Sequence, residues 1–289
     1  MKNFLYIILV TLFWGIVSSC SSENSIVFDI EDIVDSTYED NDYYHQDTIT
    51  IAQWNIGNFS NGKSYKTTIN SENYYSKKIQ YINFIDNIDA DILGLCEFNP
   101  QFCTNDSVTR DIILAKYQHA SIGIKHNYNC NAIFSKKNHL NNSSDVIFKQ
   151  HAQYRYYRIA DINLNNVTVK IIETHLDWNQ GDTGALYRKE QIFELIDCFK
   201  NFKYVIICAD FNIYDITELS PFKEAGYLLS SDFGKEDFKT YPADNLQTAI
   251  DNIVVKGFDI LDVDIYTDAT LSDHCAIKSK LIFKRDIGE

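Results

Sequence analysis

The stretch Tyr204-Val-Ile-Ile-Cys-Ala-Asp-Phe-Asn212 decides the fold, because a nearly continuous apolar run ends in an acid and an amide. A short apolar run of this kind is typical of a buried strand. Asp and Asn also end strands for reasons of turn formation, so Asp210 taken alone indicates a turn more readily than a catalytic group. The same arrangement elsewhere in the chain changes that interpretation.

Polar side chains stand at the ends of other apolar runs in the same way. They are Asn55, Glu97, His175, Asp251, Asp273 and His274. Because carboxylates, amides and imidazoles recur at so many predicted strand ends, we expect these side chains to share one cleft.

Apolar runs and alternation predict strands and helices in alternation over the body of the chain. The predicted strands cover residues 48–55, 91–97, 130–135, 153–164, 167–175, 204–210, 249–256 and 275–283, and the predicted helices cover 71–88, 106–117 and 185–199. In the first helix, Tyr75, Ile79, Ile82 and Ile85 form the expected buried stripe. The alternation predicts a layered α/β domain.

The composition excludes several classes of protein. Of the 289 residues, 45% are hydrophobic and 14% aromatic, with only 3 Pro and 11 Gly, which excludes a mainly disordered or collagen-like chain. The net charge is -14, from 26 basic and 40 acidic residues. This charge gives no basic footprint for sequence-independent binding of phosphate backbones.

The first residues resemble a bacterial lipoprotein signal. Lys2 precedes the apolar run Phe4–Val17, which ends in Val17-Ser-Ser-Cys20; this run is shorter than the about 20 residues of a membrane-spanning helix. The alternative is a buried N-terminal helix. We expect a signal peptide over 1–19, lipidation of Cys20, and a protein anchored outside the cytoplasm in a bacterial cell envelope, periplasm-facing or surface-exposed.

The segment that follows is strongly acidic. Residues 23–47 contain nine Asp and Glu and no Lys or Arg, which predicts a lipidated acidic tether over 20–47 and a single domain over 48–289. Apolar side chains such as Val27 and Phe28 leave open that part of this tether packs on the body.

The cysteines favour packing over metal binding. Cys96, Cys208 and Cys275 lie in apolar strand-like runs, where a thiol behaves as a small hydrophobe. The minimal motifs of zinc, serine-hydrolase, P-loop and dinucleotide sites do not occur in the sequence. The disulfide pattern stays open.

Eight segments, in order, resemble the motif set of the endonuclease/exonuclease/phosphatase superfamily, the DNase I-like group. They are Gln53-Trp-Asn-Ile-Gly57, Asp91-Ile-Leu-Gly-Leu-Cys-Glu97, Asn131-Ala-Ile-Phe-Ser-Lys136, Glu173-Thr-His-Leu-Asp177, Arg188 to Gln191, Ala209-Asp-Phe-Asn212, Ile250-Asp-Asn-Ile-Val254 and Ser272-Asp-His274. The resemblance implies a four-layer αββα sandwich with two packed mixed β-sheets and the active site at one edge. Cys96 and Ala209 depart from the usual Gln and Gly.

The resemblance also implies a divalent-metal-dependent phosphoesterase, most readily a phosphodiesterase, in which water attacks the ester with acid-base help from His and Asp. Glu97 resembles the principal metal ligand, with Asn55 beside it and Asp273 completing or adjoining the position. Oxygen ligands suit Mg²⁺, or Mn²⁺, better than zinc.

The remaining roles are carried over residue by residue. His274 would act as general base or hydrogen-bond the phosphate, oriented by Asp251. His175 would bind a phosphoryl oxygen or protonate the leaving group, Asp210 would align or deprotonate water, and Asn212 would donate to the transition state. Asn55 and Arg188 are the predicted substrate-binding residues, and for Arg188 a buttressing role or a solvated helix charge is the alternative.

The segment Tyr154-Arg-Tyr-Tyr-Arg158 is interpreted mainly as strand packing, with Arg155 or Arg158 as its one candidate substrate contact, and Trp178 as a candidate for the cleft rim. The substrate stays open among nucleic acid, lipid headgroup and sugar or inositol phosphate. A catalytically silent surface binding lipoprotein is the alternative from another class. A monomer is expected.

Overall fold

A computed structural model describes residues 27–28, 48–59, 74–99, 116–124, 130–150, 154–164, 166–234 and 237–284. The predicted signal peptide, Cys20 and most of the acidic tether lie outside these residues, as does most of the predicted helix 106–117. None of the helices in the described part is long and apolar enough to cross a membrane.

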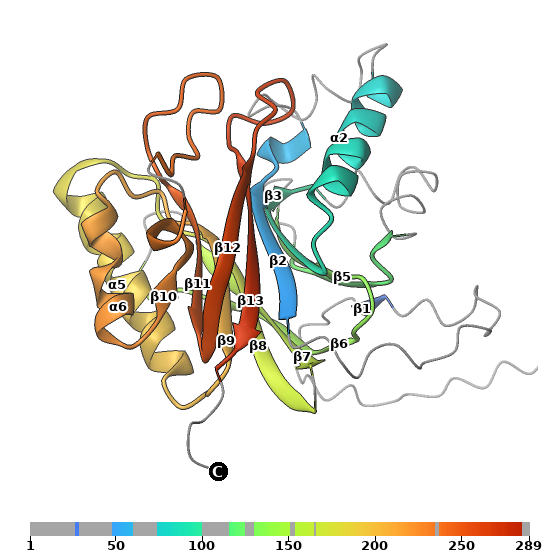
Figure 1. Cartoon of the computed structure of the whole chain (residues 1–289). Helices are drawn as coiled ribbons and strands as arrows, with labels where there is room; N and C mark the ends of the chain where they lie inside the picture. The colour runs from blue at the N-terminus through green and yellow to red at the C-terminus, as the bar shows by residue number, and fades with distance from the viewer. Residues whose placement is uncertain are drawn as a thin grey trace, which may run out of the picture.

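Two β-sheets pack face to face in the middle of the molecule (Figure 1). The first is seven-stranded, in the order β1 (Val27–Phe28), β4 (His119–Ile122), β5 (Cys130–Ser135), β3 (Ile92–Phe98), β2 (Thr48–Asn55), β13 (Ala276–Phe283) and β12 (Phe258–Tyr266). The second is six-stranded, in the order β10 (Leu228–Leu229), β11 (Asp251–Lys256), β9 (Val205–Asp210), β8 (Val167–His175), β7 (Tyr156–Leu164) and β6 (Leu140–Ile147).

Helices cover the two outer faces (Figure 1). Helix α2 (Tyr74–Ile88) lies on the seven-stranded sheet, and α5 (Gly181–Phe199) and α6 (Ser220–Glu224) lie on the six-stranded sheet. Short 3₁₀ turns occur at Gly57–Phe59, Ile216–Leu219 and Ser230–Asp232. The order helix, sheet, sheet, helix is the predicted four-layer arrangement.

Three apolar cores hold these layers together. One lies under α2, around Trp54 and Tyr81, and another lies between the sheets, around Ile51 and Ile171. A third lies between the six-stranded sheet and α5, around Ile207. Because side chains alternate along a strand, every central strand contributes apolar side chains to two of these cores. The sequences of these strands are therefore nearly continuous apolar runs.

Each sheet contains one parallel pair at its centre. β2 runs parallel to β3, and β8 runs parallel to β9, whereas β11 and β13 run antiparallel to their neighbours β9 and β2. The carboxyl ends of the parallel strands therefore lie at the same edge as the amino ends of β11 and β13. This topology gathers the predicted site residues.

Two sequence predictions about the helices need correction. In α2 the buried residues are Tyr81, Ile82, Ile85 and Ile88, whereas Ile79 is 54% exposed, so the stripe begins later than predicted; the side chain of Tyr75 lies outside the described residues. Helix α5 begins at Gly181 rather than at residue 185. The prediction began too late because Gly181 and Gly184 are residues typical of turns. A Cβ at Gly184 would overlap the backbone of Asn179, so this glycine lets the helix approach the preceding loop.

Part of the predicted tether packs on the body. Val27 pairs with Ser121 and Phe28 with Ala120, which adds the antiparallel edge strand β1 beside β4. These two residues of the 20–47 segment therefore pair with the domain through their backbone.

Candidate active site

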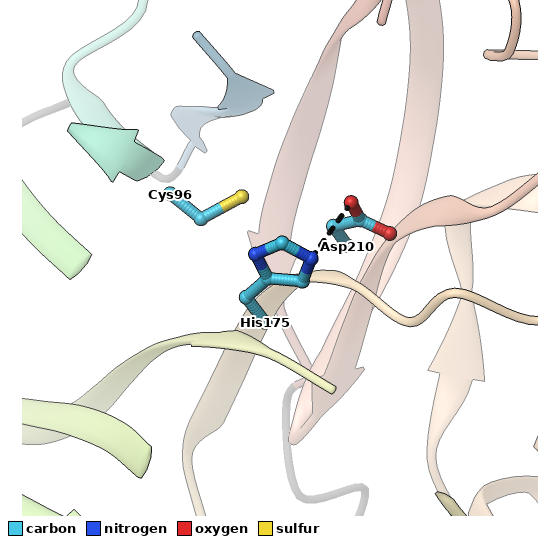
Figure 2. Close-up of side chains that lie close together, drawn as sticks. All are labelled: Cys96, His175 and Asp210. Atoms are coloured by element: carbon cyan, nitrogen blue, oxygen red, sulfur yellow. Dashed lines mark ion pairs between the residues drawn. The ribbon is translucent and has the colours of Figure 1, made fainter. Parts of the chain in front are cut away.

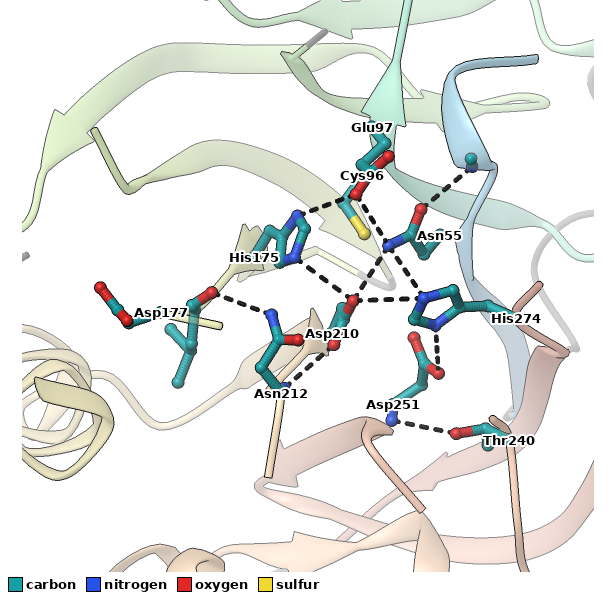
Figure 3. Close-up of polar contacts among 12 residues, drawn as sticks. Asn55, Cys96, Glu97, His175, Asp177, Asp210, Asn212, Thr240, Asp251 and His274 are labelled. Atoms are coloured by element: carbon teal, nitrogen blue, oxygen red, sulfur yellow. Dashed lines mark hydrogen bonds and ion pairs between the residues drawn. The ribbon is translucent and has the colours of Figure 1, made fainter. Parts of the chain in front are cut away.

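The strand ends enclose one cleft of about 630 Å³ at the edge of the two sheets. Asn55, Glu97, His175, Asp210, Asp273 and His274 all line it. They come from the ends of β2, β3, β8 and β9 and from the turn before β13. Figure 3 labels all of them except Asp273. The predicted shared cleft is observed for these six side chains, whereas Asp251, also predicted to belong to it, is fully buried and does not line it.

An imidazole and carboxylate pair stands at the centre of one wall. His274 Nδ1 lies 2.9 Å from Asp251 Oδ2, and Asp251 is fully buried behind the imidazole. The backbone around the pair is fixed as well, because the Asp251 amide donates to Thr240 Oγ1 at 3.1 Å and the Trp54 indole donates to the His274 carbonyl at 3.1 Å. The predicted orientation of His274 by Asp251 is the observed one.

Asp210 is the hub of the polar network (Figure 3). Asn55 Nδ2 donates to its Oδ2 at 2.9 Å, and the backbone amide of Asn212 donates to its Oδ1 at 2.9 Å. His175 Nε2 and His274 Nε2 lie 3.3 Å and 3.7 Å from the same Oδ2. The Asp210 carboxylate therefore faces both imidazoles, and each of its oxygens accepts a hydrogen bond from an amide, Asn55 Nδ2 or the Asn212 backbone N–H.

Burial drives the electrostatics of the site. Burial raises the pKa of Asp210 above its ordinary value, and it also raises the pKa of Glu97. Burial alone would lower the pKa of His274, but the carboxylates of Asp251 and Asp210 raise it to about 10. Burial, together with the Arg155 guanidinium, lowers the pKa of His175 well below its ordinary value. The two histidines are thus driven to opposite protonation states.

Two residues of the cleft have left-handed backbone conformations. Glu97 has φ 53° and Asn212 has φ 52°. Residues other than glycine adopt this backbone conformation only at a cost in free energy. At Glu97 the pairing of β3 with β5 shifts register between Leu95 and Phe98. This irregularity brings both Cys96 and Glu97 to the cleft end of the strand.

The roles of two amides differ from the predictions. Asn55 was predicted as an oxygen ligand, but its Oδ1 accepts from the Gly57 amide at 3.0 Å and its Nδ2 faces Asp210 and Glu97. Asn212 was predicted to donate to the reacting group, but its Nδ2 donates to the Leu176 carbonyl at 3.0 Å. In this structure the Asn55 amide contacts the Asp210 carboxylate, and both amides bond to nearby backbone groups.

Arg188 does not line the cleft. Its guanidinium pairs with Glu218 through Nε to Oε2 at 2.9 Å and Nη2 to Oε1 at 3.1 Å. It also donates to the carbonyl of Asn179 at 2.8 Å. The predicted substrate contact is therefore replaced by the alternative, a buttress that ties α5 to the loop following β8.

The segment 154–158 divides into two roles. Arg158 is fully buried and pairs with Asp145 at 2.9 Å, away from the cleft. Arg155 lines the cleft, its Nε has no hydrogen-bond partner, and burial lowers its pKa against the opposing effect of Asp210. Arg155 is therefore the arginine of this segment that faces the cleft.

Aromatic side chains form much of the remaining cleft wall. Trp178 lies at the rim and is 50% exposed, as the sequence suggested. The sequence prediction missed Tyr214 and Tyr241, which also line the cleft. The ring of Tyr241 packs against the His274 ring in a tilted arrangement, with centroids 4.9 Å apart. Both tyrosines lie in irregular segments, where no periodic signal marks them.

Two groups of side chains have a spacing that could hold a metal ion. Cys96, His175 and Asp210 form one group (Figure 2), and Asp210, Asp251 and His274 form the other. In the second group Asp251 and His274 are already bonded to each other. Glu97 and Asp273 add carboxylate oxygens to the same cleft. A divalent cation that prefers oxygen would take its protein ligands from the carboxylates of this cleft.

Comparison with known proteins finds no family model that matches this sequence. It also finds no matching curated protein. Solved structures, however, share its fold. An endonuclease/exonuclease/phosphatase from Bacteroides vulgatus matches with a TM-score of 0.67 and 16% identity, covering 82% of this chain and 99% of that chain.

TDP2 proteins also match. TDP2 from C. elegans has a TM-score of 0.61 at 17% identity, over 81% of this chain and 75% of that chain. D. rerio TDP2, complexed with single strand DNA product, has a TM-score of 0.63 at 15% identity, over 81% of this chain and 98% of that chain. These likenesses confirm the predicted DNase I-like four-layer fold.

Proposed function

We propose that this protein is a divalent-metal-dependent phosphoesterase, most readily a phosphodiesterase. The observation that carries the proposal is the His274–Asp251 pair, at 2.9 Å, facing Asp210 across a cleft that also contains His175, Glu97 and Arg155. Hydrolysis of a phosphate ester needs charge neutralisation on the phosphoryl oxygens, an activated water and help for the leaving oxygen. The cleft holds a group suited to each task.

The protonation states assign the roles. His274, with its raised pKa, carries a proton on both ring nitrogens near neutral pH, so Nδ1 bonds Asp251 and Nε2 donates to a phosphoryl oxygen. Asp210, with a raised pKa and two amide donors, accepts the proton of the attacking water. His175 is held neutral and interacts with the leaving group.

Arg155 supplies the remaining positive charge. It faces the cleft with an unpartnered Nε, so it binds a phosphoryl oxygen in this proposal. Glu97 and Asp273 would hold the Mg²⁺ or Mn²⁺, and the cation would neutralise developing negative charge on the phosphoryl group.

The experiment is a hydrolysis screen with Mg²⁺ or Mn²⁺ across nucleic acid, phospholipid headgroup and sugar or inositol phosphate substrates. The wild type should turn over one class, and His274→Ala should be inactive on it. His139→Ala is the matched control, because His139 is an exposed histidine outside the cleft. A wild type that is inactive on every class, or a His274→Ala variant with full turnover, would overturn the proposal.

A nucleic acid is the first substrate to test. The neighbouring D. rerio TDP2 was solved with single strand DNA product, and aromatic side chains such as Tyr154, Trp178 and Tyr214 at the rim of this cleft can stack on bases. The chain's net charge of -14 argues against tight, salt-dependent binding of long polynucleotides. Short single-stranded oligonucleotides are therefore the appropriate form.

The cellular location is part of the proposal. A lipid anchor on Cys20 would hold the enzyme on a bacterial membrane outside the cytoplasm, with the acidic segment 20–47 between anchor and domain. The sequence features Lys2, Phe4–Val17 and Val17-Ser-Ser-Cys20 support it. Metabolic labelling with a fatty-acid analogue tests it directly.

A further inference from the structure

Cys96 brings a sulfur atom into the cluster of acids and imidazoles at the cleft. Its side chain is fully buried at the end of β3, and its thiol is not part of a disulfide. Cys96, His175 and Asp210 each offer one ligand atom, and these three atoms all lie within 4.8 Å of one another (Figure 2). This group adds a sulfur and a nitrogen to a carboxylate, so its chemistry differs from that of the carboxylates proposed above to hold Mg²⁺.

The spacing of this group fits a tetrahedral ion. Zinc lies about 2.0 to 2.3 Å from carboxylate, imidazole and thiolate ligands, so two ligands of one tetrahedral zinc ion lie about 3.3 to 3.6 Å apart. His175 Nε2 and Asp210 Oδ2 already lie 3.3 Å apart. Because all three ligand atoms lie within 4.8 Å of one another, side-chain movements of about 1 Å would close the group around an ion.

Each member of the group also has a neighbour that can orient it. Gln53 Nε2 donates to Cys96 Sγ at 3.7 Å. His175 Nδ1 faces Glu97 Oε1 at 3.8 Å. Both oxygens of Asp210 accept amide hydrogen bonds, as described above. Contacts of this kind orient metal ligands in proteins, and a carboxylate is a common neighbour of the second nitrogen of a metal-bound imidazole.

Negative charge and an open side favour a cation at this position. Four carboxylates act electrostatically on Cys96, and they belong to Glu97, Glu173, Asp210 and Asp251. The Arg155 guanidinium opposes them but is outnumbered. His175 and Asp210 also line the cleft. An ion can therefore enter from the cleft and keep a fourth coordination position open toward it.

The donor set selects the kind of ion. Thiolate and imidazole ligands suit zinc, whereas Mg²⁺ prefers oxygen ligands alone. The second group of side chains with metal-like spacing, Asp210, Asp251 and His274, contains no sulfur. Its imidazole is already bonded to Asp251 at 2.9 Å. The group that contains Cys96 is therefore the better zinc site of the two.

We propose that Cys96, His175 and Asp210 form a zinc site, separate from the Mg²⁺ or Mn²⁺ position, and that zinc bound there inhibits hydrolysis. Zinc binds Cys96 as the thiolate and releases the thiol proton to solvent. It also occupies Asp210, the proton acceptor for the attacking water in the proposed function, and His175, which interacts with the leaving group. The inhibition rests on the proposed function, whereas the zinc site does not.

Cobalt tests the zinc site without any substrate. Co²⁺ replaces zinc at tetrahedral sites, and a cobalt–thiolate bond gives a charge-transfer absorption in the near ultraviolet. The full chain, freed of metal with EDTA and titrated with Co²⁺, should show this absorption, and added Zn²⁺ should abolish it. Cys96→Ser should lose the absorption. Cys208→Ser is the matched control and should keep it, because Cys208 is another fully buried free thiol on a central strand but lies outside the group.

Three outcomes of the cobalt titration would overturn the zinc site. They are a wild type without the absorption, a Cys96→Ser variant that keeps it, and an equal loss in Cys208→Ser. A second measurement needs no variant and applies if Cys96→Ser does not fold. X-ray absorption of the wild type loaded with one equivalent of Zn²⁺ should show a sulfur atom at about 2.3 Å from the zinc. A coordination shell of nitrogen and oxygen alone would also overturn the site.

The inhibition is tested in the Mg²⁺-dependent hydrolysis assay. Zn²⁺ should inhibit the wild type and Cys208→Ser at the same concentration, whereas Cys96→Ser should need at least about tenfold more Zn²⁺. Each rate is taken relative to the rate of the same protein without zinc. Absence of inhibition in the wild type, or equal inhibition in Cys96→Ser, would refute the inhibitory role.

Failure of the proposed function is distinguishable from failure of the zinc site. If the wild type hydrolyses no phosphoester, the proposed function and the inhibition fail together. The cobalt absorption and the zinc–sulfur distance still decide whether Cys96, His175 and Asp210 bind zinc.

Discussion

Removing His274 should damage turnover and stability by separate routes. Loss of a group that donates to the phosphate or moves a proton costs about 10² to 10⁴ in kcat, which corresponds to about 3 to 5 kcal/mol on the barrier. The same truncation leaves the fully buried Asp251 carboxylate without its partner at 2.9 Å. An uncompensated buried charge costs about 3 to 5 kcal/mol, so the thermal midpoint of His274→Ala should fall by about 10 °C.

Asp251→Asn separates the two effects. It removes the buried charge, so its midpoint should fall less than that of His274→Ala, while kcat drops because the amide no longer fixes the imidazole. The double variant His274→Ala/Asp251→Asn should turn over no more slowly than His274→Ala, since the pair acts as a unit. It should also be more stable than His274→Ala, because the orphaned carboxylate is gone.

The assay is kcat on the substrate found by the screen, together with calorimetric midpoints, for the wild type and the three variants. His139→Ala serves as the control for loss of an exposed imidazole. The reasoning fails if the kcat losses of the two single variants multiply in the double variant. It also fails if the double variant is less stable than both singles.

The other predictions concern the metal, the buttress, a surface ion pair and the anchor. EDTA should abolish hydrolysis, Mg²⁺ or Mn²⁺ should restore it, and Glu97→Gln should weaken Mn²⁺ binding in calorimetry while the circular dichroism spectrum stays unchanged; full activity in EDTA contradicts this. Arg188→Lys cannot keep the two hydrogen bonds to Glu218, so kcat should fall several-fold. An unchanged kcat would refute the buttressing role of Arg188. Lys136 and Lys116 lower the pKa of Asp89 despite the opposing effect of burial. The ion pairs of Asp89 with these lysines therefore stabilise the fold above about pH 4, and this stabilisation is lost as pH falls. Asp89→Asn should lower the thermal midpoint by at most about 3 °C at pH 7 and should not change it near pH 2. Cys20→Ala should abolish lipid labelling and membrane retention, and a labelled variant would refute the anchor.

The sequence predicts the central strands well because their signals are redundant. The predicted bounds of β2, β5 and β8 agree with the observed Thr48–Asn55, Cys130–Ser135 and Val167–His175. These strands supply apolar side chains to cores on both faces, so their runs are long and bounded by polar residues. A strand that is buried on both sides leaves a clear pattern in the sequence.

Edge strands leave a weaker pattern. β6 (Leu140–Ile147) has the sequence Leu-Asn-Asn-Ser-Ser-Asp-Val-Ile and is mostly solvent-accessible. β12 (Phe258–Tyr266) alternates apolar and acidic residues, but its register shifts between Ile260 and Asp262, which breaks the alternation. Both strands pair with the next strand along the chain in an irregular register, so local periodicity did not predict them.

The site was predicted where it depends on strand ends and missed where it depends on tertiary packing. The imidazole of His274 and the carboxylate of Asp251 lie together because β11 and β13 both begin at the cleft edge. Arg188 was predicted as a substrate-binding residue from the resemblance, but its carboxylate partner, Glu218, lies on a 3₁₀ turn 30 residues further along the chain. No spacing along the chain predicts that pair.

The cleft contains more acidic than basic groups, and this excess does not serve the stability of the fold. Asp210, Asp251 and Glu173 are almost completely buried, and Glu97 and Asp273 add acids at the cleft surface. Among the described residues, Arg155 and the protonated His274 are the cations that line this cleft. Burying acids in excess of cations destabilises a fold, and the apolar layer directly below shows that these strands pack well without them. A protein that keeps such a cluster gains something other than stability from it, and a divalent cation with a phosphoryl group would supply the interactions that the acids and the two cations lack.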